Sequence, residues 1–147
     1  MRTVQTQARL VEWLSAEDMH SSSKKWLSEL QFIKIEQLFF EDLIKSYTLQ
    51  LLSDNHFVEI KKIINEISKI QKKNTTLIKS VKRHENKLEI LVDGIDQIKE
   101  EVLYKNNHRE LLQLMNDYLK AYQLIKKQLF EIVKIVMKHE KQKHLLD

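Results

Sequence analysis

The chain contains no cysteine and no proline, and its 147 residues include one glycine, Gly94. Without cysteine there is no disulfide, no thiolate nucleophile and no cysteine-ligated zinc or iron–sulfur site. Tight turns and phosphate-binding loops use glycine to reach positive φ, so its scarcity argues against nucleotide-binding loops and most β architectures. The composition therefore favours an all-α protein.

Long apolar runs are also missing. No stretch approaches the roughly 20 apolar residues that a membrane-spanning helix needs, and residues 1–20 lack the continuous apolar segment of a secretory signal. We therefore expect no membrane span and a cytoplasmic location. With 42% apolar and 31% charged residues, we expect one globular domain over residues 1–147.

A helical repeat dominates the middle of the chain. Stepping alternately by three and four residues from Ile60 to Val102 meets thirteen positions, of which eleven are aliphatic. This period is typical of a helix that packs along its whole length. The positions on this seam are Ile60, Ile63, Ile67, Ile70, Asn74, Leu77, Val81, His84, Leu88, Leu91, Ile95, Ile98 and Val102.

The seam keeps its phase across Gly94, and a packed helix tolerates a glycine at a cost of about 1 kcal/mol. We therefore predict one long helix over 54–104. The alternative is a break at Asp93-Gly94, which would give a four-helix bundle.

The same period predicts further long helices over 22–52 and 107–145, and the apolar residues of the first twenty predict a short helix over 4–17. Serines at 21–23 and an asparagine at 106 or 107 are suited to cap the helices that follow them. Because the connections are short, neighbouring helices should be antiparallel. The sequence thus predicts an antiparallel bundle of three long helices plus a short N-terminal helix.

An apolar cluster, "FIKIEQLFF", spans residues 32–40. Ile33 and Phe40 belong to the inward seam of the predicted helix, whereas four other apolar residues lie behind it. A helix that is apolar all round must be covered all round. Either the N-terminal helix or a central position in the bundle covers this patch, or it binds a second copy or another helical protein. The residues assigned to partner binding are Trp26, Phe32, Ile35, Leu38 and Phe39.

This patch supports the leading functional hypothesis, a non-enzymatic module for protein–protein interaction or assembly. Catalysis needs a pocket with convergent polar groups, commonly placed on loops. The predicted loops are a few residues long, and no serine–histidine–aspartate set or paired carboxylates stand out. We expect no cofactor.

A basic segment between Glu66 and Glu85 supports a second hypothesis, because it contains no acidic residue. Such a stripe could bind nucleic acid or another anionic surface. It has no arginine cluster and no interleaved aromatic residue, and the alternative is an ordinary solvated helix face. Its cations are Lys69, Lys72, Lys73, Lys79, Lys82 and Arg83.

His84 supports a third hypothesis, since it is a titratable residue on the apolar seam. In an antiparallel hairpin that turns near residue 54, position 84 lies opposite position 24, about one turn from His20 and Glu17. These three side chains are candidates for a metal-binding or pH-sensing site. The alternative is a hydrogen-bonded histidine in the seam. The chain contains no Glu-x-x-His motif of the kind that di-iron bundles use.

Overall fold

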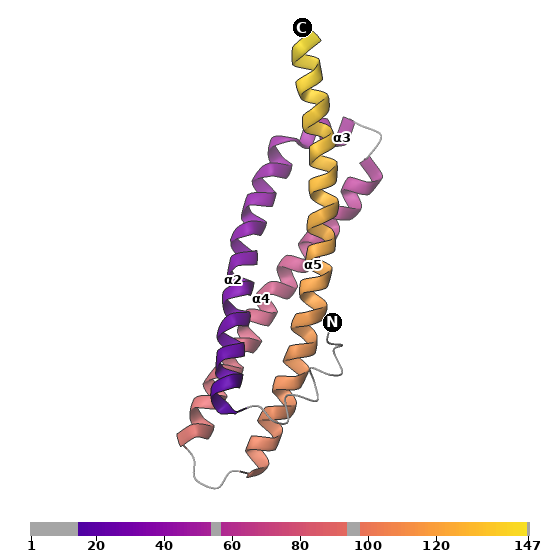
Figure 1. The fold of residues 1–147 in the computed structure, drawn as a ribbon. Helices are drawn as coiled ribbons and strands as arrows, with labels where there is room; N and C mark the ends of the chain where they lie inside the picture. The colour runs from indigo at the N-terminus through magenta and orange to yellow at the C-terminus, as the bar shows by residue number, and fades with distance from the viewer. Residues whose placement is uncertain (1–14, 54–56, 94–97, 147) are drawn as a thin grey trace, which may run out of the picture.

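The computed structural model describes residues 15–53, 57–93 and 98–146, and over these ranges the chain is helical except at Ser15 and Tyr47. Three long helices lie side by side in an elongated bundle and alternate in direction (Figure 1). This arrangement confirms the predicted all-α bundle. The helices are α2 (Ala16–Ser46), α3 (Thr48–Ser53), α4 (Phe57–Asp93) and α5 (Ile98–Leu146).

The beginning of α2 is set by a capping box. The Ser15 Oγ accepts a hydrogen bond from the Asp18 backbone N–H at 3.1 Å, and the Asp18 carboxylate accepts one from the Ser15 backbone N–H at 3.2 Å. The predicted cap at serines 21–23 is therefore wrong. Those serines lie inside α2, where the Ser23 Oγ donates to the Met19 carbonyl at 2.9 Å. The predicted helix over 4–17 falls mostly outside the described residues, and its last two residues belong to α2.

The C-terminal end of α2 continues into α3 with one interruption. At Tyr47 the backbone N–H still donates to the Leu43 carbonyl at 3.2 Å, and the Tyr47 carbonyl accepts from the Leu51 N–H at 2.8 Å. The predicted helix over 22–52 is thus two helices separated by a single non-helical residue.

The prediction of one helix over 54–104 is wrong. α4 ends at Asp93, and α5 begins at Ile98 and runs antiparallel to it, so the chain reverses direction between them (Figure 1). The alternative break at Asp93-Gly94 had the correct position. The predicted turn at Asn106 and Asn107 does not form, because α5 passes through it as regular helix. The described part of the bundle has three long helices and the short α3, so the break after Asp93 replaces the predicted turn and does not add a fourth long helix.

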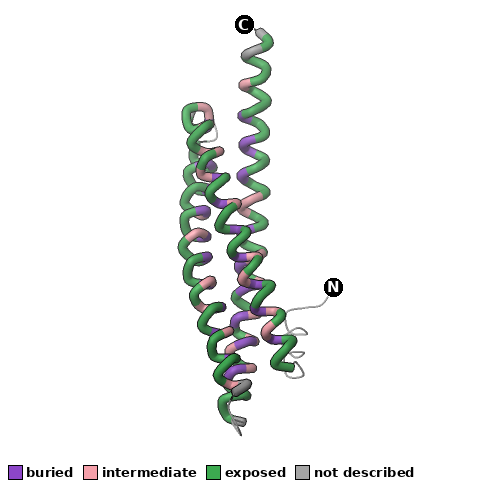
Figure 2. The backbone as a smooth tube through the Cα atoms, turned by 90° about the vertical axis from the view of Figure 1, so that its left-hand side faces the viewer, coloured by how far each residue is buried: buried purple, intermediate pink, exposed green. Residues whose placement is uncertain are grey.

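The core lies along α4, which packs closely against both α2 and α5. Figure 2 shows the buried residues along the inward sides of the helices. At mid-height, the Asn74 amide donates to the Leu30 carbonyl and to the Tyr118 hydroxyl, each at 3.0 Å, and so joins all three long helices. A buried polar group with such specific partners fixes the register of helices around it. No helix within the described ranges is long and apolar enough to cross a membrane.

Candidate functional site

α2 is apolar on two opposite faces. Its inward face contributes Leu30, Ile33 and Phe40 to the core. Its outward face, which we call the outer face of α2, exposes four large side chains to solvent. Their exposed fractions are 62% for Phe32, 66% for Ile35, 57% for Leu38 and 57% for Phe39.

The predicted partner-binding residues therefore divide into two groups. The four residues of the outer face remain uncovered by the elements that the structure describes. Trp26 is the exception, since it is 7% exposed and its ring stacks on His108 with a centroid distance of 4.7 Å. Its assignment to partner binding is wrong, because it belongs to the inward seam of α2. The alternative prediction was that other parts of the bundle cover this patch. α3, α4 and α5 do not cover it, because all four side chains stay exposed.

An apolar groove continues from the outer face of α2 toward α5. The groove has a volume of about 820 Å³ and lies between the α2–α3 junction and the C-terminal half of α5. Phe39 belongs both to the outer face and to the lining of this groove. The other apolar lining residues are Leu43, Tyr47, Phe130, Val133 and Met137. The charged residues of the groove are all on α5, namely Lys134, Lys138, Glu140 and Lys141.

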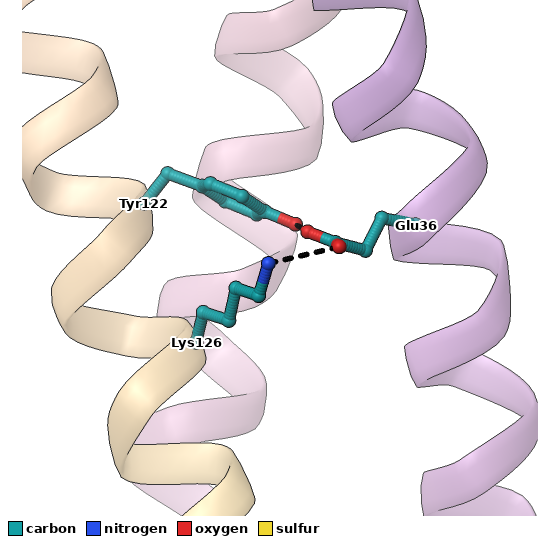
Figure 3. Close-up of polar contacts among 3 residues, drawn as sticks. All are labelled: Glu36, Tyr122 and Lys126. Carbon is teal, nitrogen blue, oxygen red and sulfur yellow. Dashed lines mark hydrogen bonds and ion pairs between the residues drawn. The ribbon is translucent and has the colours of Figure 1, made fainter.

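Below the groove, polar side chains join α2 to α5. One turn below Phe39, Glu36 on α2 reaches across to α5, where its carboxylate accepts a hydrogen bond from the Tyr122 hydroxyl (Figure 3). The Lys126 Nζ lies 2.9 Å from the other oxygen of the same carboxylate. Burial, reinforced by the neighbouring carboxylate, raises the pKa of Tyr122 well above its ordinary value. The phenol therefore stays protonated and donates, which ties α2 to α5 below the groove.

At the other end of the bundle, four rings from three helices form a continuous stack. Trp26 of α2 lies on His108 of α5, and His108 lies beside His84 of α4 at a centroid distance of 5.1 Å. His84 in turn stacks on Tyr104 of α5 at 4.0 Å. Within the stack, the His84 Nε2 and the His108 Nδ1 are 2.9 Å apart and share a hydrogen bond.

Both histidines are neutral in this arrangement. Each is at most 4% exposed, and burial lowers the pKa of both to about 4. His108 and Lys87 add to the effect on His84, because a positive charge on either neighbour opposes protonation. One neutral ring donates its N–H to the unprotonated nitrogen of the other. The pair is thus a satisfied core contact at neutral pH.

The structure does not assemble the predicted metal site. His84 pairs with His108, whereas Glu17 is exposed and His20 is only partly buried on α2. In the described part of the chain, no group of three or more histidine, aspartate or glutamate residues could hold a metal ion. The contact of His84 with His108 was not predicted. The predicted reversal lay at Asn106 and Asn107, which does not place position 108 opposite position 84, whereas the observed reversal between α4 and α5 does.

The basic segment lies on the solvent side of α4. All six cations, Lys69, Lys72, Lys73, Lys79, Lys82 and Arg83, are exposed. Lys69 pairs with Glu66 of the same helix at 3.3 Å, a contact of a kind that contributes little to stability. The segment is therefore a solvated face that remains open to an anionic partner.

Comparison with protein-family models, with curated proteins and with solved structures found no match.

Proposed function

We propose that the protein is a non-enzymatic module for protein–protein association that binds a second helical surface through the outer face of α2. The observation that carries this proposal is the exposure of Phe32, Ile35, Leu38 and Phe39 on one side of a helix whose other side is already buried. Exposed large apolar residues clustered in this way are typical of an interface rather than of an isolated surface.

The energetic gain from covering this face is substantial. Complete burial of a phenylalanine, leucine or isoleucine contributes about 1.5–3 kcal/mol, and each of the four side chains is more than half exposed. Covering them would therefore contribute on the order of 1–2 kcal/mol each.

The first test replaces Phe32 and Phe39 together with glutamate. Both side chains point to solvent, so we expect the helical circular dichroism spectrum and the thermal midpoint to stay close to those of the native chain. Two charges placed in an apolar interface should abolish association. Light scattering behind a sizing column, over a range of concentration, measures self-association. A photoreactive residue at position 32 in expressing cells reports contact with any protein partner.

Leu124→Glu is the matched control, because Leu124 on α5 is also 57% exposed but lies outside both the outer face and the groove. A photoreactive residue at position 124 serves the same purpose in cells. Association that persists in the double variant, with cross-linking at position 32 no stronger than at position 124, would contradict the proposal.

A second candidate function is electrostatic binding to a polyanion through the solvent side of α4. The exposure of all six predicted cations on one helix supports it. Only one of the chain's four arginines lies in this segment, and arginine is the residue that forms forked contacts with phosphate. Such binding would therefore be weak and sensitive to salt.

A further inference from the structure

We infer that the partner surface for the outer face of α2 is the groove of a second copy of this chain, so that two chains form a two-fold symmetric dimer. This inference rests on the proposed function and names the partner. In the dimer, the outer face of each α2 covers the groove between α2 and α5 of the other copy.

The position of Phe39 allows both surfaces to be covered by one partner chain. Phe39 is part of the outer face and also lines the groove, so the two surfaces are adjacent on one side of the molecule. A two-fold axis near Phe39 would bring the outer face of each chain over the groove of the other. Both surfaces would then be buried in a single step, as in an isologous interface in which the same patch serves both copies.

The exposed apolar area is sufficient for a dimer of this kind. Six large side chains are between 42% and 66% exposed across the two surfaces, and these are Phe32, Ile35, Leu38, Phe39, Phe130 and Met137. At up to about 100 Å² for each half-exposed side chain, the value for a half-exposed aromatic ring, they present at most roughly 600 Å² per copy and roughly 1,200 Å² in a dimer. This is the lower limit of a stable specific interface, before the polar rim is counted.

Charge favours a second copy over a basic partner. The groove has three lysines and Glu140 as its only acid. Asp42 is exposed and falls between Leu38 and Phe39 around the helix, within the outer face. When α2 of one copy covers the groove of the other, Asp42 meets a rim that contains Lys134 and Lys138. Opposite charges around an apolar centre are the usual composition of a specific interface.

The experiment is a charge exchange between the two surfaces. In the Asp42→Lys variant, a lysine would face the lysines of the rim, and in the Lys134→Glu/Lys138→Glu variant, Asp42 would face two glutamates. We expect each variant alone to dimerise at least roughly tenfold more weakly than the native chain, because like charges would oppose one another at both contacts. An equimolar mixture of the two variants should recover dimerisation, since both contacts are then between opposite charges.

Light scattering and sedimentation equilibrium measure the masses at low salt, with one variant carrying a mass tag so that the mixed dimer is recognised. The control is Lys79→Glu/Lys82→Glu, which makes the same change of charge on α4 outside the groove. It should dimerise like the native chain.

Three results would overturn the inference. The first is a native chain whose mass stays at 17.7 kDa up to the highest concentration measured. The second is that the charge variants dimerise as strongly as the control variant. The third is that the equimolar mixture of the two variants does not recover dimerisation. Each of these is distinguishable from failure of the proposed function. If cross-linking at position 32 to another protein persists, or if Phe32→Glu/Phe39→Glu still abolishes association, then the outer face is an interface and only the groove of a second copy is wrong.

Discussion

At the residue scale, the pair of His84 and His108 makes the stability of the bundle sensitive to acid. In the unfolded chain each histidine has a pKa near 6.5, whereas burial lowers both values to about 4 in the folded chain. Between these values the unfolded state binds more protons than the folded state. The contribution of the pair is therefore complete above about pH 6.5 and is lost as the pH falls toward 4.

We predict that the free energy of unfolding falls by on the order of a few kcal/mol between pH 7 and pH 4.5, with much of the loss already present at pH 5. Denaturant unfolding at several pH values measures this change. Protonation would place a charge in a stack of rings from three helices, beside Lys87 on α4 and near the partly buried Glu85.

The control for this prediction is His84→Gln/His108→Gln, which removes both titrating groups and keeps polar side chains in the core. Its stability at pH 7 should be lower, but its decline between pH 7 and pH 5 should be clearly shallower than that of the native chain. Equal slopes for the two proteins would show that other groups cause the acid sensitivity.

At the scale of the helix, Asn106 distinguishes the observed α5 from the predicted turn. In the structure Asn106 lies within α5, away from its ends, and its side chain is exposed to solvent. Its Oδ1 accepts a long hydrogen bond from a guanidinium nitrogen of Arg109 at 3.5 Å. Asparagine in an exposed helix interior is less favourable than alanine by several tenths of a kcal/mol. An N-cap asparagine, by contrast, stabilises a helix by about 1 kcal/mol relative to alanine.

We therefore predict that Asn106→Ala leaves stability unchanged or raises it by up to about 0.5 kcal/mol. The thermal midpoint of unfolding gives the sign directly. Ser15→Ala is the comparison, because Ser15 is the observed cap of α2, and its loss should cost about 1 kcal/mol. A loss of similar size at position 106 would place a helix start there and contradict the continuous α5.

The helix boundaries also show why periodicity misplaced the reversal of the chain. Leu88 before Gly94 and Tyr104 after Ile98 are both buried and pack in the same cluster. The connection between α4 and α5 happens to preserve the three-four spacing of the apolar residues, so the pattern crosses the break without a change of phase. The single glycine, next to Asp93 at the end of α4, was the more reliable local signal.

At the scale of the whole molecule, charge is divided unevenly among the helices. α2 is acidic in balance, whereas α4 has nine basic residues against five acidic ones. We predict that the chain is retained on duplex DNA or heparin only at low salt and is released below about 150 mM NaCl, since few phosphates can be contacted at once. A column eluted with a salt gradient measures this.

Lys69→Glu/Lys73→Glu should lower the eluting salt concentration, whereas Lys120→Glu/Lys127→Glu, on exposed positions of α5 outside the groove, provides the comparison of equal charge change. Specific nucleic-acid binding would appear as retention well above physiological salt that depends on the α4 lysines. Such a result would favour the second candidate function over protein association.

The sequence by itself determined the all-α class, the inward seams and the apolar excess of α2. These properties follow from local composition and from the 3.6-residue turn of a helix, which report the side of each helix that faces inward. The tertiary structure decided where the chain reverses, that His84 meets His108, and that none of the described helices covers Phe32 and Phe39. These features depend on which helix supplies the opposing surface, and a period within one segment contains no information about its neighbour in space.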